Sequence, residues 1–68
     1  MSTFGEKAKR LRDGKNLSTR MLAEELEISS GHISKYENNV HEPKLSVLRK
    51  YAKFFNVTLD YLCDDTKE

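Results

Sequence analysis

Small polar residues and a histidine follow one another in residues 29–35 of this 68-residue chain, which read Ser-Ser-Gly-His-Ile-Ser-Lys. Only Ile33 in this segment is apolar. Hydroxyl, imidazole and ammonium groups can pair with the donors and acceptors on the edges of nucleic-acid bases. If the chain presents these groups on an exposed surface, they are candidates for reading base edges, with an ordinary polar surface as the alternative.

The remaining reactive residues do not indicate catalysis or metal binding. Cys63 is the single cysteine, so no internal disulfide can form, and no histidine lies near it in the sequence to act as a base. His32 and His41 lie on different predicted elements without further ligands beside them. No apolar run approaches the length of about 18 residues that spans a membrane. We therefore expect no enzyme, no metal or other cofactor, no membrane segment and a cytoplasmic location.

The charged residues are unevenly distributed along the chain. The net charge of +1 by itself argues only weakly for a nucleic-acid partner. Residues 1–20, however, contain six Lys or Arg against two Asp or Glu, whereas residues 21–43 contain five Glu against Lys35 alone. This asymmetry predicts a basic face and an acidic face, with an ordinary surface of interspersed charges as the alternative.

The elements that would position these side chains begin with a helix at about residues 4–13. Thr3 and Glu6 have the spacing of a capping box, and an apolar residue then recurs at each turn. Gly14 is expected to end this helix in the left-handed conformation.

Two short helices around a tight turn are predicted next. Ser18 caps a helix that ends near Glu27, and Ser29 caps another that runs to Asn38, where Asn38 and Asn39 can take a terminal left-handed conformation. Both helices present an apolar stripe to one core. The stripe consists of Leu22, Ala23, Leu26, Ile28, Ile33 and Tyr36. This pattern is typical of a helix-turn-helix.

A loop and two further helices are predicted after this motif. Pro43 disfavours helical geometry in the preceding residue, so residues 40–43 form a loop and a helix begins just after it. Thr58 caps a last helix that ends at about Cys63, which leaves residues 64–68 as an acidic tail or linker stub. We therefore expect one domain over residues 1–63, an all-α bundle of five helices. In the fourth helix the apolar residues form two stripes, Leu45, Leu48, Ala52 and Phe55 on one and Val47, Tyr51 and Phe54 on the other.

The motif resembles the XRE-type DNA-binding domains of phage Cro and repressor proteins. Their pattern is Leu-Ala, four residues, Ile-Ser and then Ile-Ser-x-Tyr-Glu, and the likeness runs from about Gly5 to Leu62. The matching residues are Leu22, Ala23, Ile28, Ser29, Ile33, Ser34, Tyr36 and Glu37. The resemblance implies a compact lambda-repressor-like fold in which the second helix of the motif enters the major groove of duplex DNA.

The outward residues of that second helix are the candidates for reading bases, because its two apolar residues must face the core. They are Ser30, Gly31, His32, Ser34 and Lys35. The resemblance places all of them except Ser34 at positions where family members usually read bases. Lys35 and a protonated His32 would favour guanine acceptors. Gly31 costs a helix about 1 kcal/mol relative to Ala, so it is either tolerated or allows the backbone to approach DNA closely.

Contacts to phosphates are expected at helix starts and in the loop, where free N–H groups and the helix dipole favour anions. The candidates are Thr19, Arg20, Ser29, Asn38, Asn39 and Lys44. Thr19 stands where the family commonly has a glutamine that touches phosphate or base. Three departures concern the fold. Glu27 replaces the usual glycine of the turn, Met21 replaces the acidic residue that would complete a capping box, and Lys44 replaces the usual capping Ser or Thr.

Glu37 needs a cationic partner, because it is an anion near a helix C-terminus, where the dipole is also negative. The resemblance supplies one, since an arginine seven residues before the start of the second helix commonly pairs with this glutamate. Arg12 stands at that spacing from Thr19. We predict an ion pair between Arg12 and Glu37 that joins the first helix to the third.

The chain is thus expected to be a bacterial or phage transcriptional regulator that binds an inverted-repeat operator in double-stranded DNA as a homodimer. Repression by occupancy is expected, with activation through acidic contacts to RNA polymerase as a further outcome. The alternative is a protein-interaction module, an antitoxin or an antagonist of another regulator, that has lost DNA binding. Phe54, Tyr61 and Cys63 are candidates for the dimer interface, although they can instead cover the core of a single copy.

Overall fold

The computed structural model describes residues 3–63, which form five α-helices and no strand. In chain order these are α1 (Phe4–Gly14), α2 (Thr19–Leu26), α3 (Ser30–Glu37), α4 (Leu45–Phe55) and α5 (Leu59–Cys63). The predicted all-α, five-helix fold is confirmed. The predicted acidic tail, residues 64–68, lies outside the described residues. Within residues 3–63, no helix has both the length and the apolar character needed to cross a membrane.

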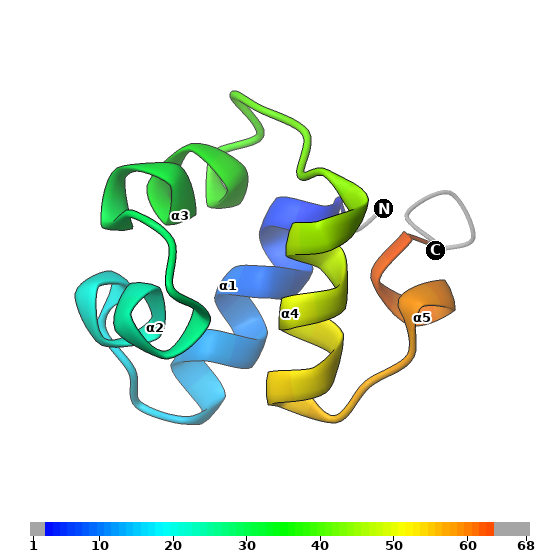
Figure 1. Ribbon diagram of the computed structural model, residues 1–68, viewed down its shortest axis with the longest axis horizontal. Helices are drawn as coiled ribbons and strands as arrows, with labels where there is room; N and C mark the ends of the chain where they lie inside the picture. The colour runs from blue at the N-terminus through cyan, green and yellow to red at the C-terminus, as the bar shows by residue number, and fades with distance from the viewer. Residues whose placement is uncertain (1–2, 64–68) are drawn as a thin grey trace.

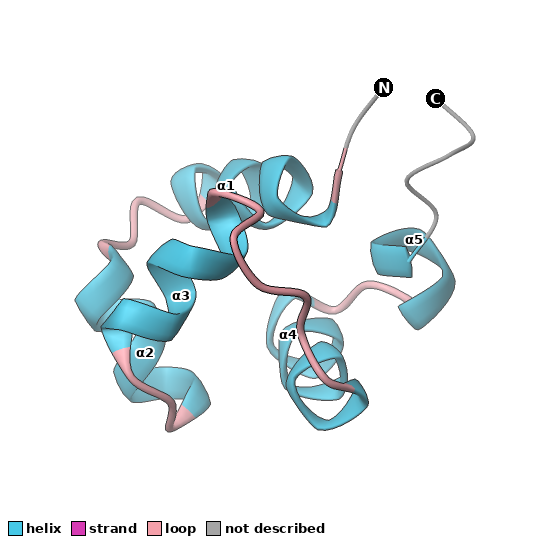
Figure 2. Cartoon of the chain, turned by 90° about the horizontal axis from the view of Figure 1, so that it is seen from above, coloured by secondary structure: helices cyan, strands magenta, loops and turns pink. Residues whose placement is uncertain are grey.

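The helices surround one core, with α1 behind the others in the view of Figure 1. α1 packs against α3 and α5, while α2 packs against α3 and α4. Seen from above, α2 and α3 lie on one side of the molecule and α5 on the opposite side (Figure 2). α3 and the loop that follows it form the upper edge in Figure 1. The outer side of α3 is therefore left uncovered by the other helices.

Side-chain caps begin four of the five helices, as the sequence predicts. In α1, Glu6 N–H donates to Thr3 Oγ1 at 3.2 Å and Thr3 N–H donates to Glu6 Oε1 at 3.0 Å, which is the predicted capping box. Ser18, Ser29 and Thr58 each accept a hydrogen bond from a backbone N–H three residues later. Lys44 precedes α4 without a side-chain cap.

The ends of the helices differ from the prediction at Gly14, which does not take the left-handed conformation. Gly14 stays in α1, and the left-handed residue is Asn16 at φ 58°. The chain turns there because the N–H groups of residues 15–17 bond back to the carbonyls of Arg12 and Asp13. Glu27, at φ 58°, ends α2 where the family pattern has glycine. A non-glycine residue pays about 1 kcal/mol or more for this conformation.

Every helix contributes one side chain that is completely buried. These five residues are Ala8, Leu22, Ile33, Tyr51 and Leu62. The two predicted stripes of α4 are wrong in detail, because its buried row is Val47, Tyr51 and Phe55, which draws on both stripes. Leu45 is 56% exposed. The row has the i, i+4, i+8 spacing of one helix face, and Leu48, Ala52 and Phe54 beside it are half-buried against the same core.

Tyr51 buries its ring edge-on against Phe4, yet its hydroxyl has no hydrogen-bond partner among residues 3–63. Burial first, and then the carboxylate of Glu37, raise the pKa of Tyr51 well above its ordinary value. In the unfolded chain the hydroxyl ionises at about pH 10, whereas in the folded chain it stays neutral. Stability must therefore fall as the pH rises above about 10, because only the unfolded state releases this proton.

Replacing Tyr51 by Phe is accordingly expected to raise the free energy of unfolding by about 1 kcal/mol at neutral pH, since a buried hydroxyl without a partner is removed. The alkaline loss of stability should also become shallower. Urea unfolding at pH 7 and above pH 10 measures both effects. Tyr61→Phe is the control, because Tyr61 is 41% exposed. A clear loss of stability in Tyr51→Phe would show that the hydroxyl is hydrogen-bonded after all.

Candidate nucleic-acid interface

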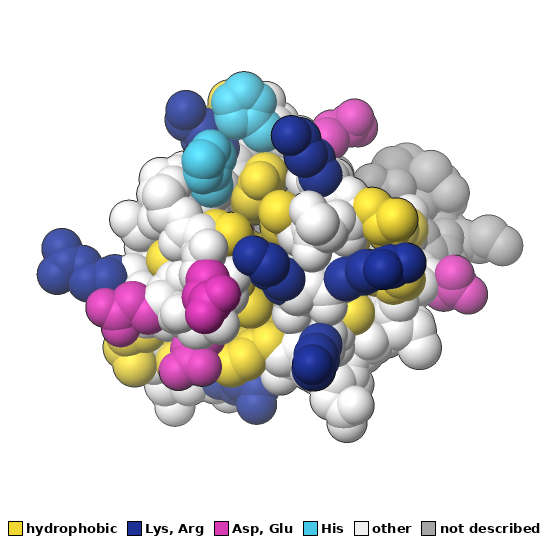
Figure 3. Space-filling model, in the orientation of Figure 1, with side chains coloured by type: hydrophobic (Ala, Val, Ile, Leu, Met, Phe, Trp, Pro, Cys, Tyr) yellow, Lys and Arg dark blue, Asp and Glu magenta, His cyan; other side chains and the backbone are white. Residues whose placement is uncertain are grey.

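α3 divides its side chains cleanly between the core and the surface. Ile33 is completely buried and Tyr36 is 9% exposed, so they fix the rotation of the helix about its axis. The predicted base-reading residues all lie on the exposed remainder of the helix: Ser30, Gly31, His32, Ser34 and Lys35. Figure 3 shows the histidine side chains at the upper edge of the molecule, with Lys and Arg side chains beside them. The structure thus brings the five candidates together on one accessible helix.

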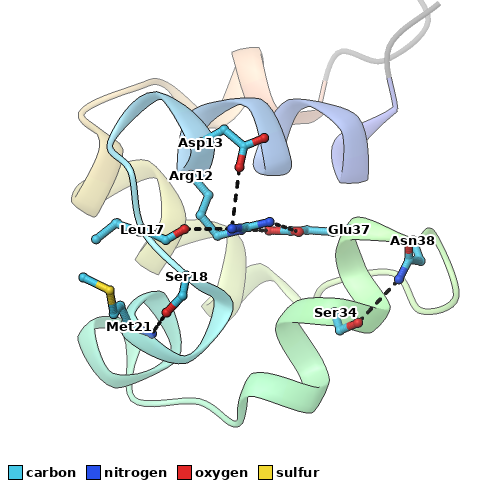
Figure 4. Close-up of polar contacts among 8 residues, drawn as sticks. All are labelled: Arg12, Asp13, Leu17, Ser18, Met21, Ser34, Glu37 and Asn38. Atoms are coloured by element: carbon cyan, nitrogen blue, oxygen red, sulfur yellow. Dashed lines mark hydrogen bonds and ion pairs between the residues drawn. The ribbon is translucent and has the colours of Figure 1, made fainter.

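His32 is the most constrained of these exposed side chains. Its Nδ1 lies 2.8 Å from the hydroxyl oxygen of Ser29. Its ring also stacks on the ring of Tyr36, with centroids 6.2 Å apart and planes 19° from parallel. Ser34, by comparison, accepts only a long hydrogen bond of 3.4 Å from Nδ2 of Asn38 (Figure 4).

The ion pair expected between Arg12 and Glu37 is present (Figure 4). Arg12 Nε donates to Glu37 Oε2 at 2.7 Å and Arg12 Nη2 donates to Oε1 at 2.9 Å, which is the two-pronged geometry of the strongest such pairs. Arg12 Nη1 also donates to the carbonyl of Leu17 at 2.7 Å. The hydrogen bond to Glu37, which outweighs the opposing effect of burial, raises the pKa of Arg12. One guanidinium therefore ties together α1, the α1–α2 loop and the end of α3.

The predicted phosphate-contacting residues lie at the start of α2, the start of α3 and along the α3–α4 loop. Thr19 is half-buried, and the others are exposed: Arg20, Ser29, Asn38, Asn39 and Lys44. Two of them also have structural roles. The Ser29 hydroxyl caps α3, and Asn39, at φ 60°, forms the left-handed end of the turn after α3.

The three candidates for a dimer interface are not gathered into one patch. Phe54 is half-buried near the C-terminal end of α4, where it packs on Phe55 and lies 5.9 Å beneath Lys15 Nζ. Tyr61 and Cys63 are exposed on α5, and Cys63 shares a surface cavity with Thr3 and Phe4. Phe54 lines a different cavity, between α2 and α4.

Lys7, one of the six cations of residues 1–20, has a structural role that was not predicted from the sequence. It is 3% exposed, and its Nζ donates to the backbone carbonyl of Tyr61 at 2.8 Å. The same Nζ lies 5.0 Å from the centre of the Tyr61 ring. A cation is favourable there because the C-terminal end of a helix is negative. The signal was available, since Lys7 falls three residues after Phe4 on the buried side of α1.

Among residues 3–63, no group of three His, Cys, Asp or Glu side chains is placed to hold a metal ion. The site is an exposed, polar helix side with one cation, Lys35, and it belongs to the second helix of a helix-turn-helix. Fold and site together define the class as a helix-turn-helix DNA-binding domain. The model of the Helix-turn-helix family matches residues 9–62, and the chain belongs to this family, in its XRE-type branch.

Solved structures show the same fold. The P22 c2 repressor, solved in complex with a synthetic operator, matches with a TM-score of 0.87 at 24% identity, over 93% of this chain and 96% of that one. The N-terminal DNA binding domain of SinR from Bacillus subtilis matches with a TM-score of 0.85 at 27% identity, over 96% of both chains. The lambda-repressor-like architecture is therefore confirmed.

Relatives by sequence are transcriptional regulators and not enzymes. The HTH-type transcriptional activator BcrR of Enterococcus faecalis is 46% identical over 59 residues, which cover 87% of this chain and 29% of BcrR. The HTH-type transcriptional regulator ImmR of Bacillus subtilis (strain 168) is 30% identical over 60 residues, which cover 88% of this chain and 47% of ImmR. The chain thus spans less than half the length of either relative.

Proposed function

We propose that this chain binds double-stranded DNA in a sequence-specific manner, with α3 in the major groove, and regulates transcription by occupying an operator in the cytoplasm. The observation that carries the proposal is the exposed outer side of α3, which is held at a fixed rotation by buried Ile33 and Tyr36 and by the Arg12–Glu37 pair. Only the major groove admits a helix and offers a distinct pattern for each base pair.

Two copies on an inverted repeat are the arrangement that we propose for the bound state. A single α3 of eight residues can reach only a few base pairs, so a second copy supplies the remaining specificity. Repression by occlusion requires nothing beyond binding. Activation is supported by the relative BcrR, which is a transcriptional activator, and by the exposed Glu24 and Glu25 on α2, which offer an acidic contact for RNA polymerase.

Titration of a fluorescent mixed-sequence duplex at several salt concentrations tests duplex binding. We expect the logarithm of the binding constant to fall linearly with the logarithm of the salt concentration, with a slope of about −0.9 for each phosphate neutralised. A titration with no binding even at low salt would refute the proposal.

Lys44→Gln is expected to make that slope shallower by about 0.9 for each copy bound, because one phosphate contact is lost. Lys44 is exposed immediately before α4, and its side chain makes no capping hydrogen bond. The ammonium group can therefore contact a phosphate. Lys53→Gln removes the same charge from the exposed opposite end of α4 and should leave the slope unchanged. Equal slopes for Lys44→Gln and the unaltered chain would remove Lys44 from the phosphate contacts.

A protein-binding role is the second candidate, because SinR, whose domain shares this fold, was also solved in complex with SinI. The absence of arginine from α3 favours it, since arginine is the commonest reader of guanine. A tight protein complex formed by a chain that binds no duplex would establish this role in place of DNA binding.

A further inference from the structure

We propose that the hydroxyl of Ser29 sets the protonation pattern of the His32 ring and thereby requires a hydrogen-bond acceptor on the base that His32 reads. The inference rests on the proposed function, because it takes α3 as the base-reading helix. It gives Ser29, which the sequence predicts to contact a phosphate, a further role as the residue that positions the His32 ring.

The direction of the hydrogen bond between the two side chains follows from what Ser29 already does. Its Oγ accepts from the backbone N–H of His32 at 3.2 Å, and an N–H can only donate. The hydroxyl proton remains to be placed, and Nδ1 of His32 lies 2.8 Å away. If Oγ donates to Nδ1, both groups are satisfied. In the reverse arrangement Oγ would accept from two donors and its own proton would be left to solvent, so Nδ1 would gain no donor from the protein.

The helix dipole favours the same direction. His32 lies in the first turn of α3, where the positive end of the dipole stabilises a lone pair and disfavours an N–H beside it. The neutral ring therefore carries its proton on Nε2, because a bond accepted at one ring nitrogen fixes the proton on the other. In the protonated ring Nε2 also carries a proton, so Nε2 is a donor in both forms.

The ring is also held in place, which leaves Nε2 as the ring nitrogen without a hydrogen-bond partner among residues 3–63. Ser29 contacts the ring at Nδ1, and the ring of Tyr36, itself buried, stacks against its face. His32 is exposed, so Nε2 is the nitrogen that remains for DNA. In the major groove guanine presents two neighbouring acceptors, N7 and O6, whereas cytosine presents only a donor. Adenine and thymine each present one acceptor there, N7 and O4, so we assign guanine as the preferred base and exclude cytosine at the position that His32 reads.

Nitrogen-detected NMR of the free protein tests the protonation pattern without any DNA. We expect the proton of neutral His32 on Nε2, whereas His41, exposed in the α3–α4 loop, should show the ordinary mixture of the two forms. In Ser29→Gly, a substitution that helix N-caps tolerate, His32 should revert to the mixture seen for His41. A proton on Nδ1 of His32, or the same mixture in both histidines, would overturn the proposal.

Base preference tests the consequence for specificity. With a duplex that the unaltered chain binds, His32→Ala should reduce the preference for guanine over cytosine at one position in each half-site by about fivefold, the worth of a hydrogen bond of about 1 kcal/mol. Ser29→Gly should reduce this preference by a smaller factor, because the ring then carries its proton on Nε2 only part of the time. Ser18→Gly removes the same hydroxyl from the start of α2 and should leave the preference intact. In a His32→Ala background Ser29→Gly should have no further effect.

The two tests separate this inference from the proposed function. An unchanged base preference in Ser29→Gly would overturn the role of Ser29 in specificity even if DNA is bound. A chain that shows the expected protonation pattern but binds no duplex would refute the proposed function and, with it, the assignment of guanine.

Discussion

Replacing Arg12 by Met is expected to destabilise the domain by about 3 to 5 kcal/mol, the cost of leaving one charge of a buried pair without its partner. The Glu37 side chain is 6% exposed and would lose both of its hydrogen bonds to the guanidinium. The carbonyl of Leu17 would lose its donor as well. For a domain of this size the loss approaches the whole free energy of unfolding.

Thermal unfolding measures this effect, since each 1 kcal/mol lowers the melting temperature of a small domain by about 4 to 8 °C. Arg49→Met, on the exposed side of α4, is the matched control and should melt close to the unaltered chain. Adding Glu37→Leu to Arg12→Met should recover much of the loss, because the unpaired buried charge is then removed. If Arg12→Met melts within about one degree of the unaltered chain, the pair contributes nothing to stability.

Replacing Gly5 by Ala is expected to cost about 1 to 3 kcal/mol, although Ala is the better helix former. A Cβ at this position would lie 2.6 Å from the backbone carbonyl oxygens of both Tyr36 and Glu37 and 2.7 Å from Oδ1 of Asn39. Backbone atoms cannot rotate away as side chains can. The substitution must therefore push α1 from the end of α3.

Gly31→Ala is the matched control, because a Cβ there meets nothing closer than Ser29 Oγ at 3.9 Å. It should stabilise the free domain by up to about 1 kcal/mol. Urea unfolding of the two variants gives the comparison. Opposite signs are expected, and a Gly5→Ala variant as stable as Gly31→Ala would refute the close contact between α1 and α3. The same Gly31 variant addresses DNA, since weaker duplex binding in a more stable protein would indicate close approach of the backbone.

Features that depend on residues within about four positions of one another could be predicted from the sequence. The caps at Thr3, Ser18, Ser29 and Thr58 are of this kind, because each is completed by a backbone N–H three residues later. The exposure of the outer residues of α3 likewise follows from helical periodicity once Ile33 and Tyr36 are assigned to the core.

Features that depend on how helices cross could not be predicted. Gly5 has an ordinary helical surrounding in the sequence, and only the approach of α3 to α1 makes its lack of a side chain necessary. The buried row of α4 was misassigned because apolar residues cover more than one side of this helix, and only its packing against α2 and α5 shows which of them are buried. The Arg12–Glu37 pair spans 25 positions, and the family resemblance, not the local pattern, indicated it. A dimer surface depends on a second copy and stays a prediction.

Selection of bound sites from a pool of random duplexes tests most directly the central claim that α3 reads DNA. We expect an inverted repeat to be enriched, with half-site centres about 34 to 36 Å apart along the duplex. A pool that shows no enrichment after repeated rounds at low salt would contradict sequence-specific DNA binding by this chain.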